Sequence, residues 1–328
     1  MEILQDDTMR ELYNASLNGC VSSLRILIQR DPLILSKVSL YPFSETPLHI
    51  ASLLGNLEFC QILLDIDPNL AAEVNSEGHC PLHLASAKGY TEIVRALLLT
   101  NEETCLIRDK DDKLPLHFAA MRGRVEAIKE LNNVMPETET IRIMSETDDH
   151  GSVLHLCVCY NHLEALKILV QSVRGDNRLQ FLSAKDKGGN NILHLAVRRT
   201  QIKIIKYLLS LSEMTTTINT LNNVGLTPLD MLDHSSGDSI SLTIKHILTK
   251  EGAQRSTNIV RTHLPASSST QVNIHHMTMS QQEDCVLSPH NGPPQPQTLP
   301  TQTSPRNSQS SQTRRNRWNM FENFCTTY

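Results

Sequence analysis

The sequence predicts an all-α solenoid of stacked helix-turn-helix units, followed by a disordered C-terminal tail. Three observations lead to this prediction. A short phrase centred on Leu-His recurs at a near-constant interval, a helical stripe of apolar residues follows each copy, and the pattern stops near residue 250. Aromatic residues make up only 4% of the 328 residues, which favours a thin core built from aliphatic side chains.

The repeated phrase has the form Pro-Leu-His followed by a short apolar run. It reads TPLHIA at 46–51, CPLHLA at 80–85, LPLHFA at 114–119, SVLHLC at 152–157, NILHLA at 191–196 and, as a last variant, TPLDML at 227–232. The His or Asp positions are separated by 34, 34, 38, 39 and 36 residues. A catalytic residue is not copied at a near-fixed period, so we predict that these His residues are structural.

Each phrase is expected to begin the first helix of a unit. A Thr in its first position can cap the helix, and a Pro in the next position fits the first helical turn, where its missing N–H costs nothing. A turn position ends each first helix, at Gly19, Gly55, Gly89, Gly123, Asn161 and Thr200. Gly and Asn tolerate the left-handed conformation that reverses the chain, and Thr200 fits this role least well.

A second helix follows each turn. These helices are predicted at 57–64, 91–99, 125–131, 163–170 and 202–209, where apolar residues recur at i, i+3 and i+4. Residues 11–28 have the same two-helix pattern without the phrase, as a capping unit would. We therefore expect a capping unit at 1–38, six repeats at 39–250 with long connections between about 132 and 190, and a tail at 251–328.

The tail is predicted to be disordered. Residues 265–313 are rich in Ser, Thr, Gln, Pro and Asn, so they bury too little apolar surface to offset the entropy of ordering them. The final stretch, 313–328, mixes Arg with Trp and Phe. Two alternatives stay open for it: an amphipathic segment that meets a membrane surface or a partner, or an unstructured chain end.

Composition and motifs exclude several function classes. The net charge of −5 divides into +3 on residues 252–328 and −8 on the remainder, too little to indicate nucleic-acid binding. No signal peptide is recognisable and no apolar run reaches the roughly 18 residues of a membrane helix, so the chain is expected in the cytoplasm. The eight Cys are irregularly spaced, which indicates reduced thiols rather than a disulfide framework.

The sequence gives no sign of an enzyme, a metal site or a cofactor. Each repeated His belongs to a different unit, whereas zinc needs four ligands around one point. The densest cluster, Cys157 and Cys159 beside His155, has no second pair of ligands. Nucleotide-binding glycine loops and nucleophile motifs are absent from the sequence. We therefore expect a monomeric protein without catalytic, cofactor or metal residues.

The phrase, its period and the two-helix unit resemble the ankyrin repeat over roughly residues 8–250. The resemblance implies that the repeated His residues hydrogen-bond the backbone of neighbouring loops and tie the units together. Linkers such as Asp31-Pro32 and Asp67-Pro68, with the closing TPLD phrase, are similar to the plant ankyrin-repeat family that ends in a PGG membrane domain. That family implies C-terminal membrane helices in longer forms and, for some members, a role in plant defence signalling.

The resemblance also implies where a partner binds. Ankyrin repeats recognise partners on a concave surface, through loop-tip residues before the phrase and the fourth and fifth residues after the His. At these positions the sequence has Glu77, His79, Lys88, Lys110, Asp111, Lys113, Met121, Arg122, Tyr160, Asn190, Arg198 and Arg199. We therefore predict a protein-binding scaffold or adaptor in plant signalling or defence. The alternative is a membrane-associated signalling regulator that acts through its C-terminal region at the cytoplasmic face of the plasma membrane.

Overall fold

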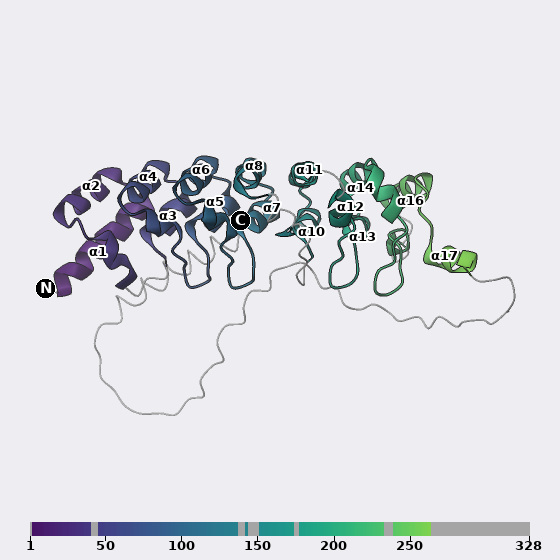
Figure 1. Ribbon diagram of the computed structural model, residues 1–328, viewed down its shortest axis with the longest axis horizontal. Helices are drawn as coiled ribbons and strands as arrows, with labels where there is room; N and C mark the ends of the chain where they lie inside the picture. The colour runs from purple at the N-terminus through teal and green to yellow at the C-terminus, as the bar shows by residue number, and fades with distance from the viewer. Residues whose placement is uncertain are drawn as a thin grey trace, which may run out of the picture. The chain divides into compact units, whose positions relative to one another are not determined.

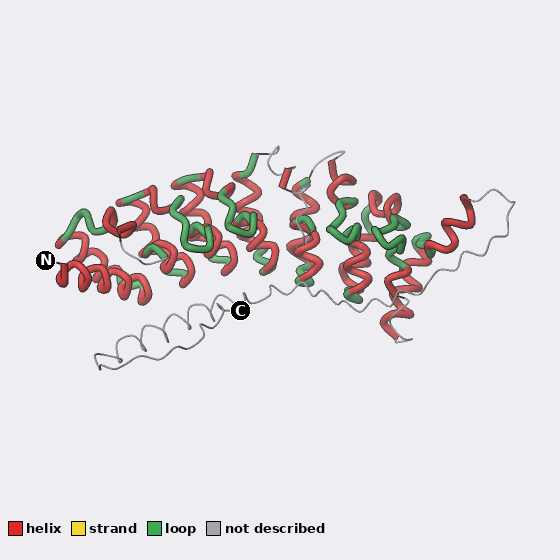
Figure 2. The backbone as a smooth tube through the Cα atoms, turned by 90° about the horizontal axis from the view of Figure 1, so that it is seen from below, coloured by secondary structure: helices red, strands yellow, loops and turns green. Residues whose placement is uncertain are grey.

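The computed structural model describes residues 2–40, 45–136, 142–143, 151–173, 177–232 and 239–263. Contacts divide the chain into a unit of Met1–Ser280 and a second of Gln281–Tyr328, and all the described residues belong to the first. Within these ranges the regular structure is helical and no β-strand occurs, as Figure 2 shows. The predicted all-α fold is therefore confirmed.

The helices occur as consecutive antiparallel pairs, as the apolar periodicity predicts. The pairs are α1 (Glu2–Asn18) with α2 (Val21–Arg30), α3 (Pro47–Leu54) with α4 (Leu57–Ile66), α5 (Pro81–Lys88) with α6 (Thr91–Thr100), α7 (Pro115–Met121) with α8 (Val125–Val134), α10 (Val153–Cys159) with α11 (Leu163–Ser172), and α13 (Ile192–Arg198) with α14 (Ile202–Leu209). In the last unit the 3₁₀ helix η4 (Asp230–Leu232) replaces the first helix and precedes α16 (Ser239–Lys250).

Short helices occupy the connections between units. They are η1 (Leu35–Leu40), η2 (Pro68–Ala71), η3 (Glu102–Leu106), α12 (Asn177–Leu182) and α15 (Ser212–Thr217). The extra residues in the fourth and fifth spacings therefore include helical turns. A further helix, α17 (Ser256–His263), follows the last unit.

Neighbouring units pack helix on helix in two rows (Figure 1). The first helices α3, α5, α7, α10 and α13 contact one another in that order, and so do the second helices α2, α4, α6, α8 and α11. Figure 1 also shows that the loops before α5 and α7 project from the first row, on the side away from the second row. The core between the rows contains mainly Leu, Ile, Val and Ala, with Phe59 and Phe181 fully buried.

The repeated phrase starts each first helix through a His-based capping arrangement. Pro occupies the first helical position of α3, α5 and α7, and the phrase His occupies the third. The His Nδ1 accepts a hydrogen bond from the N–H of the residue that caps its own helix. The nitrogen–nitrogen distances are 3.2 Å for Thr46–His49, 3.0 Å for Cys80–His83, 3.1 Å for Leu114–His117, 3.1 Å for Ser152–His155 and 3.3 Å for Asn191–His194. His therefore takes the place of the Glu or Gln of an ordinary capping box.

The other ring nitrogen of the phrase His joins one unit to the next. Its Nε2–H donates to a backbone oxygen in the following loop, just before the next phrase. We call this contact the histidine bridge. It joins His49 to the His79 carbonyl at 2.9 Å, and His83 to Lys113, His155 to Asn190 and His194 to Leu226 at 3.1 Å each. The structure thus confirms the tie between units that the ankyrin resemblance implies.

The turn position after each first helix is left-handed in every predicted case. Gly19, Gly55, Gly89, Gly123, Asn161 and Thr200 have φ angles of 62°, 83°, 79°, 63°, 60° and 54°. Thr200 therefore adopts this conformation although it fits least well by residue type. A β-carbon in this region costs roughly 1–2 kcal/mol, so Asn161 and Thr200 are held there by their surroundings.

A second contact between units lies at the turn end. The side chain next to the turn residue donates back to a carbonyl at the end of the preceding first helix, and we call this contact the turn bridge. It joins Asn56 to Ser16 at 3.0 Å, Arg124 to Ala87 at 3.1 Å, His162 to Met121 at 3.0 Å and Gln201 to Val158 at 2.7 Å. These side chains press against the preceding turn, because a β-carbon added to Gly123 would lie 2.5 Å from His162 Nδ1.

The ordered part of the chain continues beyond the predicted boundary at residue 250. The Ser256 N–H donates to Asp230 Oδ2 at 2.9 Å, and the Thr227 hydroxyl donates to the Gln254 carbonyl at 2.9 Å. Asp230, in the His position of the last phrase, therefore anchors the segment that leads to α17. The described chain thus extends past the predicted boundary, and the rest of the predicted tail, beyond 263, lies outside the described residues.

Replacing His83 with Ala should lower the free energy of unfolding by about 1–3 kcal/mol. The change leaves the Cys80 N–H and the Lys113 carbonyl without their partner inside a buried site. Chemical denaturation of the full chain measures the loss. His246→Ala is the control, because His246 is exposed on α16 and its removal should cost less than about 0.5 kcal/mol. Equal losses in the two variants would contradict the structural role of the histidine bridge.

Replacing Gly123 with Ala should destabilise the protein more than replacing Gly225 with Ala. Both glycines have positive φ, at 63° and 81°, so both substitutions carry the left-handed cost of roughly 1–2 kcal/mol. A β-carbon at Gly225 would meet no atom within 4 Å, whereas at Gly123 it would displace the hydrogen-bonded His162 ring. We expect a further loss of about 1 kcal/mol or more for Gly123→Ala in the same denaturation experiment. Indistinguishable losses would show that the turn bridge does not crowd this turn.

Candidate protein-binding surface

His49, His83 and His194 have neither a free ring nitrogen nor the pKa of a general base. Burial lowers the pKa of His49, His83 and His194 to about 4, although the loop carbonyls they contact favour the charged form. At neutral pH each ring therefore carries its proton on Nε2 and accepts on Nδ1. In the described part of the chain, no group of three or more His, Cys, Asp and Glu side chains could hold a metal ion.

The loops before the phrases are rigid turns that present their tips to solvent. Asn75 Oδ1 accepts from the N–H groups of Glu77 and His79, at 2.9 and 2.8 Å, and so ties the loop to its own backbone. Consecutive loops are also joined, since the Lys110 N–H donates to the Glu77 carbonyl at 3.1 Å. Of the predicted tip residues, Glu77, Lys110 and Asp111 are exposed.

His79 combines a structural contact with partial exposure. Its Nε2 lies 3.3 Å from the Asp109 carboxylate, and its ring centroid lies 5.0 Å from that of Phe118, edge to face. Burial of Asp109 opposes its ionisation, but the hydrogen bonds from His79 and from the Lys113 N–H outweigh this and lower its pKa. With 22% of its side chain exposed, His79 is the most enclosed of the predicted tip residues that still reach solvent.

Three predicted binding residues are buried, so the expectation that the stack displays them is wrong. Lys113, Asn190 and Met121 are only 6%, 7% and 8% exposed. The carbonyls of Lys113 and Asn190 accept the histidine bridges of the preceding unit, which draws these loop residues inward. The Met121 carbonyl accepts the turn bridge from His162, whose ring lies against the end of α7.

The remaining predicted residues lie at the C-terminal ends of the first helices. Lys88, Arg122, Tyr160 and Arg199 are half-buried, and Arg198 is exposed. The turn bridges hold the ends of α7, α10 and α13 side by side, because His162 and Gln201 each bond to the preceding helix. The structure therefore brings these side chains onto one continuous edge.

Sequence reasoning missed two residues on this edge, Arg124 and His162. Each directly follows a turn residue and caps the N-terminus of a second helix. Arg124 is exposed while its Nε makes a turn bridge, and His162 is half-buried. Their position after the turn is the signal that could have identified them.

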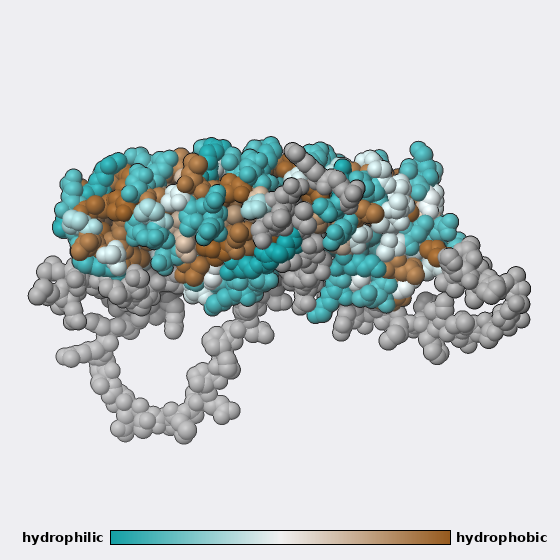
Figure 3. Space-filling view, in the orientation of Figure 1, coloured by the Kyte–Doolittle hydropathy of each residue, from teal (hydrophilic) through white to brown (hydrophobic). Residues whose placement is uncertain are grey.

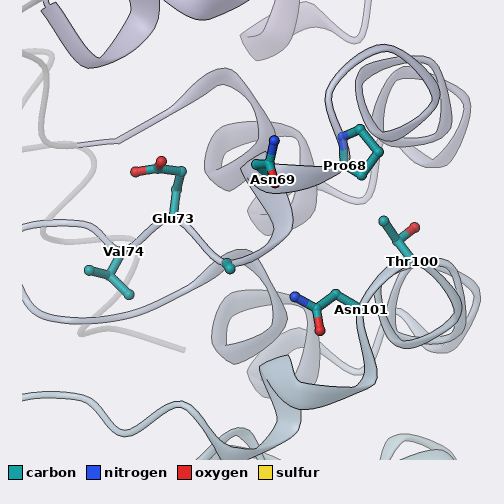
Figure 4. Close-up of a pocket in the computed structure, with 7 residues that line it drawn as sticks. Pro68, Asn69, Glu73, Val74, Thr100 and Asn101 are labelled. Carbon is teal, nitrogen blue, oxygen red and sulfur yellow. The ribbon is translucent and has the colours of Figure 1, made fainter.

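Two other surface features offer no catalytic chemistry. A groove of about 440 Å³ lies between η2 and the end of α6, where Pro68 and Asn69 face Thr100 and Asn101 across the gap (Figure 4). Its lining contains one acidic side chain, Glu73, and no nucleophile paired with a base.

The second feature is exposed apolar surface on the N-terminal units. Figure 3 shows brown residues gathered over these units, and Ile26, Leu33, Ile66 and Leu99 are 55%, 66%, 42% and 82% exposed. These side chains lie on or next to the second helices α2, α4 and α6. No helix in the described ranges is both long and apolar enough to cross a bilayer.

The stacked two-helix units and the contacts repeated between them define a class of repeat protein, and comparison with known families identifies the same class. A family model described as ankyrin repeats in three copies matches residues 12–109, 98–180 and 116–220. The chain belongs to the ankyrin-repeat family. Repeats of this kind are protein-interaction modules, so the surface they display is a binding surface for protein partners.

One known sequence and one solved structure are similar to this chain. The chain is 41% identical over 249 residues to the ankyrin repeat-containing protein BDA1 of Arabidopsis thaliana, a match that covers 74% of this chain and 57% of that protein. The chain thus spans little more than half of that relative's length. Among solved structures, the ankyrin repeat domain of Bcl-3, a member of the IκB family, matches with a TM-score of 0.52 at 20% identity, over 64% of this chain and 87% of that domain. This second match bears on the fold alone.

Stability should fall as the pH is lowered from about 6.5 towards 5. In this window the unfolded chain gains protons on His49, His83 and His194, whereas the folded chain holds these rings neutral until about pH 4. Because the unfolded state then binds more protons, acid favours unfolding. Urea denaturation at several pH values gives the slope, and His83→Gln, which removes one of the three groups, should make it shallower. An unchanged slope would contradict the neutral, buried assignment.

Proposed function

We propose that this chain is a scaffold or adaptor that binds a protein partner through its loop tips and the ends of its first helices. The observation that supports this most directly is that one set of polar side chains joins the units, whereas another set is exposed. The repeated His residues bond to neighbouring units, while the exposed and half-buried predicted binding residues reach solvent on rigid elements. Side chains held on rigid helices lose little conformational entropy on binding.

We propose further that the chain acts in plant signalling or defence, without enzymatic activity or a cofactor of its own. The similarity to an Arabidopsis ankyrin-repeat protein supports the plant context. A cytoplasmic location, including the cytoplasmic face of the plasma membrane, is consistent with the free, buried thiols of Cys60, Cys80 and Cys157. We expect the described unit to function as a monomer.

The alternative function is that of a membrane-associated signalling regulator. It rests on the sequence of 313–328, which contains three Arg followed by Trp318, Phe321 and Phe324, and this segment lies outside the described residues. Fractionation of the natural full-length product separates the two proposals. Recovery with membranes that is lost when 313–328 is deleted supports the regulator, and recovery in the soluble fraction supports the adaptor.

Replacing both Arg198 and Arg199 with Ala should weaken partner binding by more than about 1 kcal/mol and leave the melting temperature nearly unchanged. Arg supplies a large contact area and a planar donor group, and Arg198 is exposed at the end of α13. The measurement is capture of partners from plant extract by the full-length chain and by the variant, followed by affinity determination for each captured protein.

The matched control replaces Lys245 and Lys250, two exposed cations on α16, with Ala. Equal recovery of the same partners by the wild type and the double Arg variant would contradict the proposed surface. Loss of those partners only on deletion of the tail would move recognition to the C-terminal region.

A further inference from the structure

Charge is unevenly distributed along the edge formed by the turns. In three units the second helix begins with a Glu that pairs with a cation one turn further along the same helix. These pairs are Glu92–Arg95 at 2.6 Å, Glu126–Lys129 at 2.7 Å and Glu164–Lys167 at 2.8 Å. In the next unit the equivalent position is Lys203, which is exposed. The carboxylates near the turns are therefore already paired, and the last of these second helices contributes a cation instead.

Five cations along this edge have no ion-pair partner among the described residues. They are Arg122, Arg124, Arg198, Arg199 and Lys203, and we refer to them as the basic turn strip. The strip is continuous, because turn bridges join α7 to the unit of α10 and α10 to the unit of α13. Its positive charge is local, since the whole chain has a net charge of −5.

Two buried polar atoms at the end of the strip lack hydrogen-bond partners in the described part of the chain. Arg199 Nε and Gln201 Oε1 are both enclosed and unpaired. Beside them Arg198 is exposed, and its guanidinium group favours an acceptor with negative charge. At the other end of the strip, burial lowers the pKa of His162, and the nearby Arg124 and Arg122 lower it further, which disfavours a charged ring there.

We propose that the basic turn strip binds an acidic, carboxylate-rich segment of the partner protein. This inference rests on the proposed function and specifies the chemistry of its partner. Arg guanidinium groups match carboxylates in a planar, two-pronged geometry, and the half-buried Tyr160 lies between the two Arg pairs as an amphipathic contact. Packed helices lie about 10 Å apart, so the strip spans about 20 Å, which about six or seven residues of extended peptide cover.

An anionic membrane surface would also be attracted to these cations, but the neighbouring side chains favour a peptide. Interfacial binding to a bilayer needs apolar side chains that enter the acyl boundary. The exposed turn residues beside these cations, Asn161 and Thr200, are polar. Exposed apolar side chains of the described residues lie elsewhere, on the second helices of the N-terminal units, such as Ile26 and Leu99, and in the last unit, at Val224 and Leu242.

The test measures binding of a fluorescent peptide to the full-length chain. The probe has about 12 residues, with Asp and Glu alternating with Ser and Leu, and a matched peptide carries Asn and Gln instead. The wild type should bind the acidic peptide and not its amide counterpart, and added salt should weaken the complex. Arg122→Glu combined with Arg198→Glu should weaken binding by about tenfold or more. Lys245→Glu combined with Lys250→Glu, the control on α16, should leave it unchanged.

Three outcomes would overturn the proposal: equal binding of the acidic and amide peptides, equal losses in the strip and control variants, or binding of phosphatidylserine vesicles through the strip without binding of the peptide. Thermal unfolding of each variant verifies that it is folded. The experiment also separates this inference from the proposed function. If the Arg198 and Arg199 variant loses its captured partner while no acidic peptide binds, the adaptor function stands and the acidic partner is wrong. If both experiments fail, both proposals fail.

Discussion

The hydrogen bond from a buried, neutral imidazole to the next loop is the contact on which the other features depend. The phrase His satisfies the cap of its own helix with one nitrogen and a carbonyl of the following unit with the other, as His83 does for Cys80 and Lys113. A protonated ring could not accept the first bond, and an unburied ring would not exclude water from the second. The same contact therefore fixes where a helix begins and how far the next loop lies from it.

The turn bridge joins neighbouring units at the C-terminal ends of the first helices, whereas the histidine bridge joins them at the N-terminal ends. The two bridges also run in opposite directions along the chain. The histidine bridge reaches forward to the next unit, whereas Arg124, His162 and Gln201 reach back to the previous one. The first helices α5 and α10 are thus held at both ends, which resists twisting of these units against their neighbours. The His162 ring lies so close to the turn that position 123 has no room for a β-carbon, and its positive φ also favours Gly.

The fold could be predicted from the sequence because its determinants are local and repeated: the capping phrase, the left-handed turn and the apolar stripe each occur within one unit. The exposure of individual surface residues could not, because it depends on contacts between units. Lys113 and Asn190 have the polarity of loop-tip residues, but their carbonyls accept histidine bridges, and this draws them inward. The contact of Asp230 with the Ser256 N–H is of the same kind, because it joins the last phrase to residues beyond the repeat pattern.

Recognition by such a stack depends on which charges remain after the contacts between and within helices are satisfied. Glu126 and Glu164 contribute little to the surface potential, because each is paired with a Lys on its own helix. Position 203 is Lys, whereas the equivalent position in the three preceding units is Glu. This one difference places a cation, instead of a carboxylate, beside Arg198 and Arg199. A framework of similar units can acquire a selective surface through a few such unpaired residues, while the phrase His residues keep the units joined.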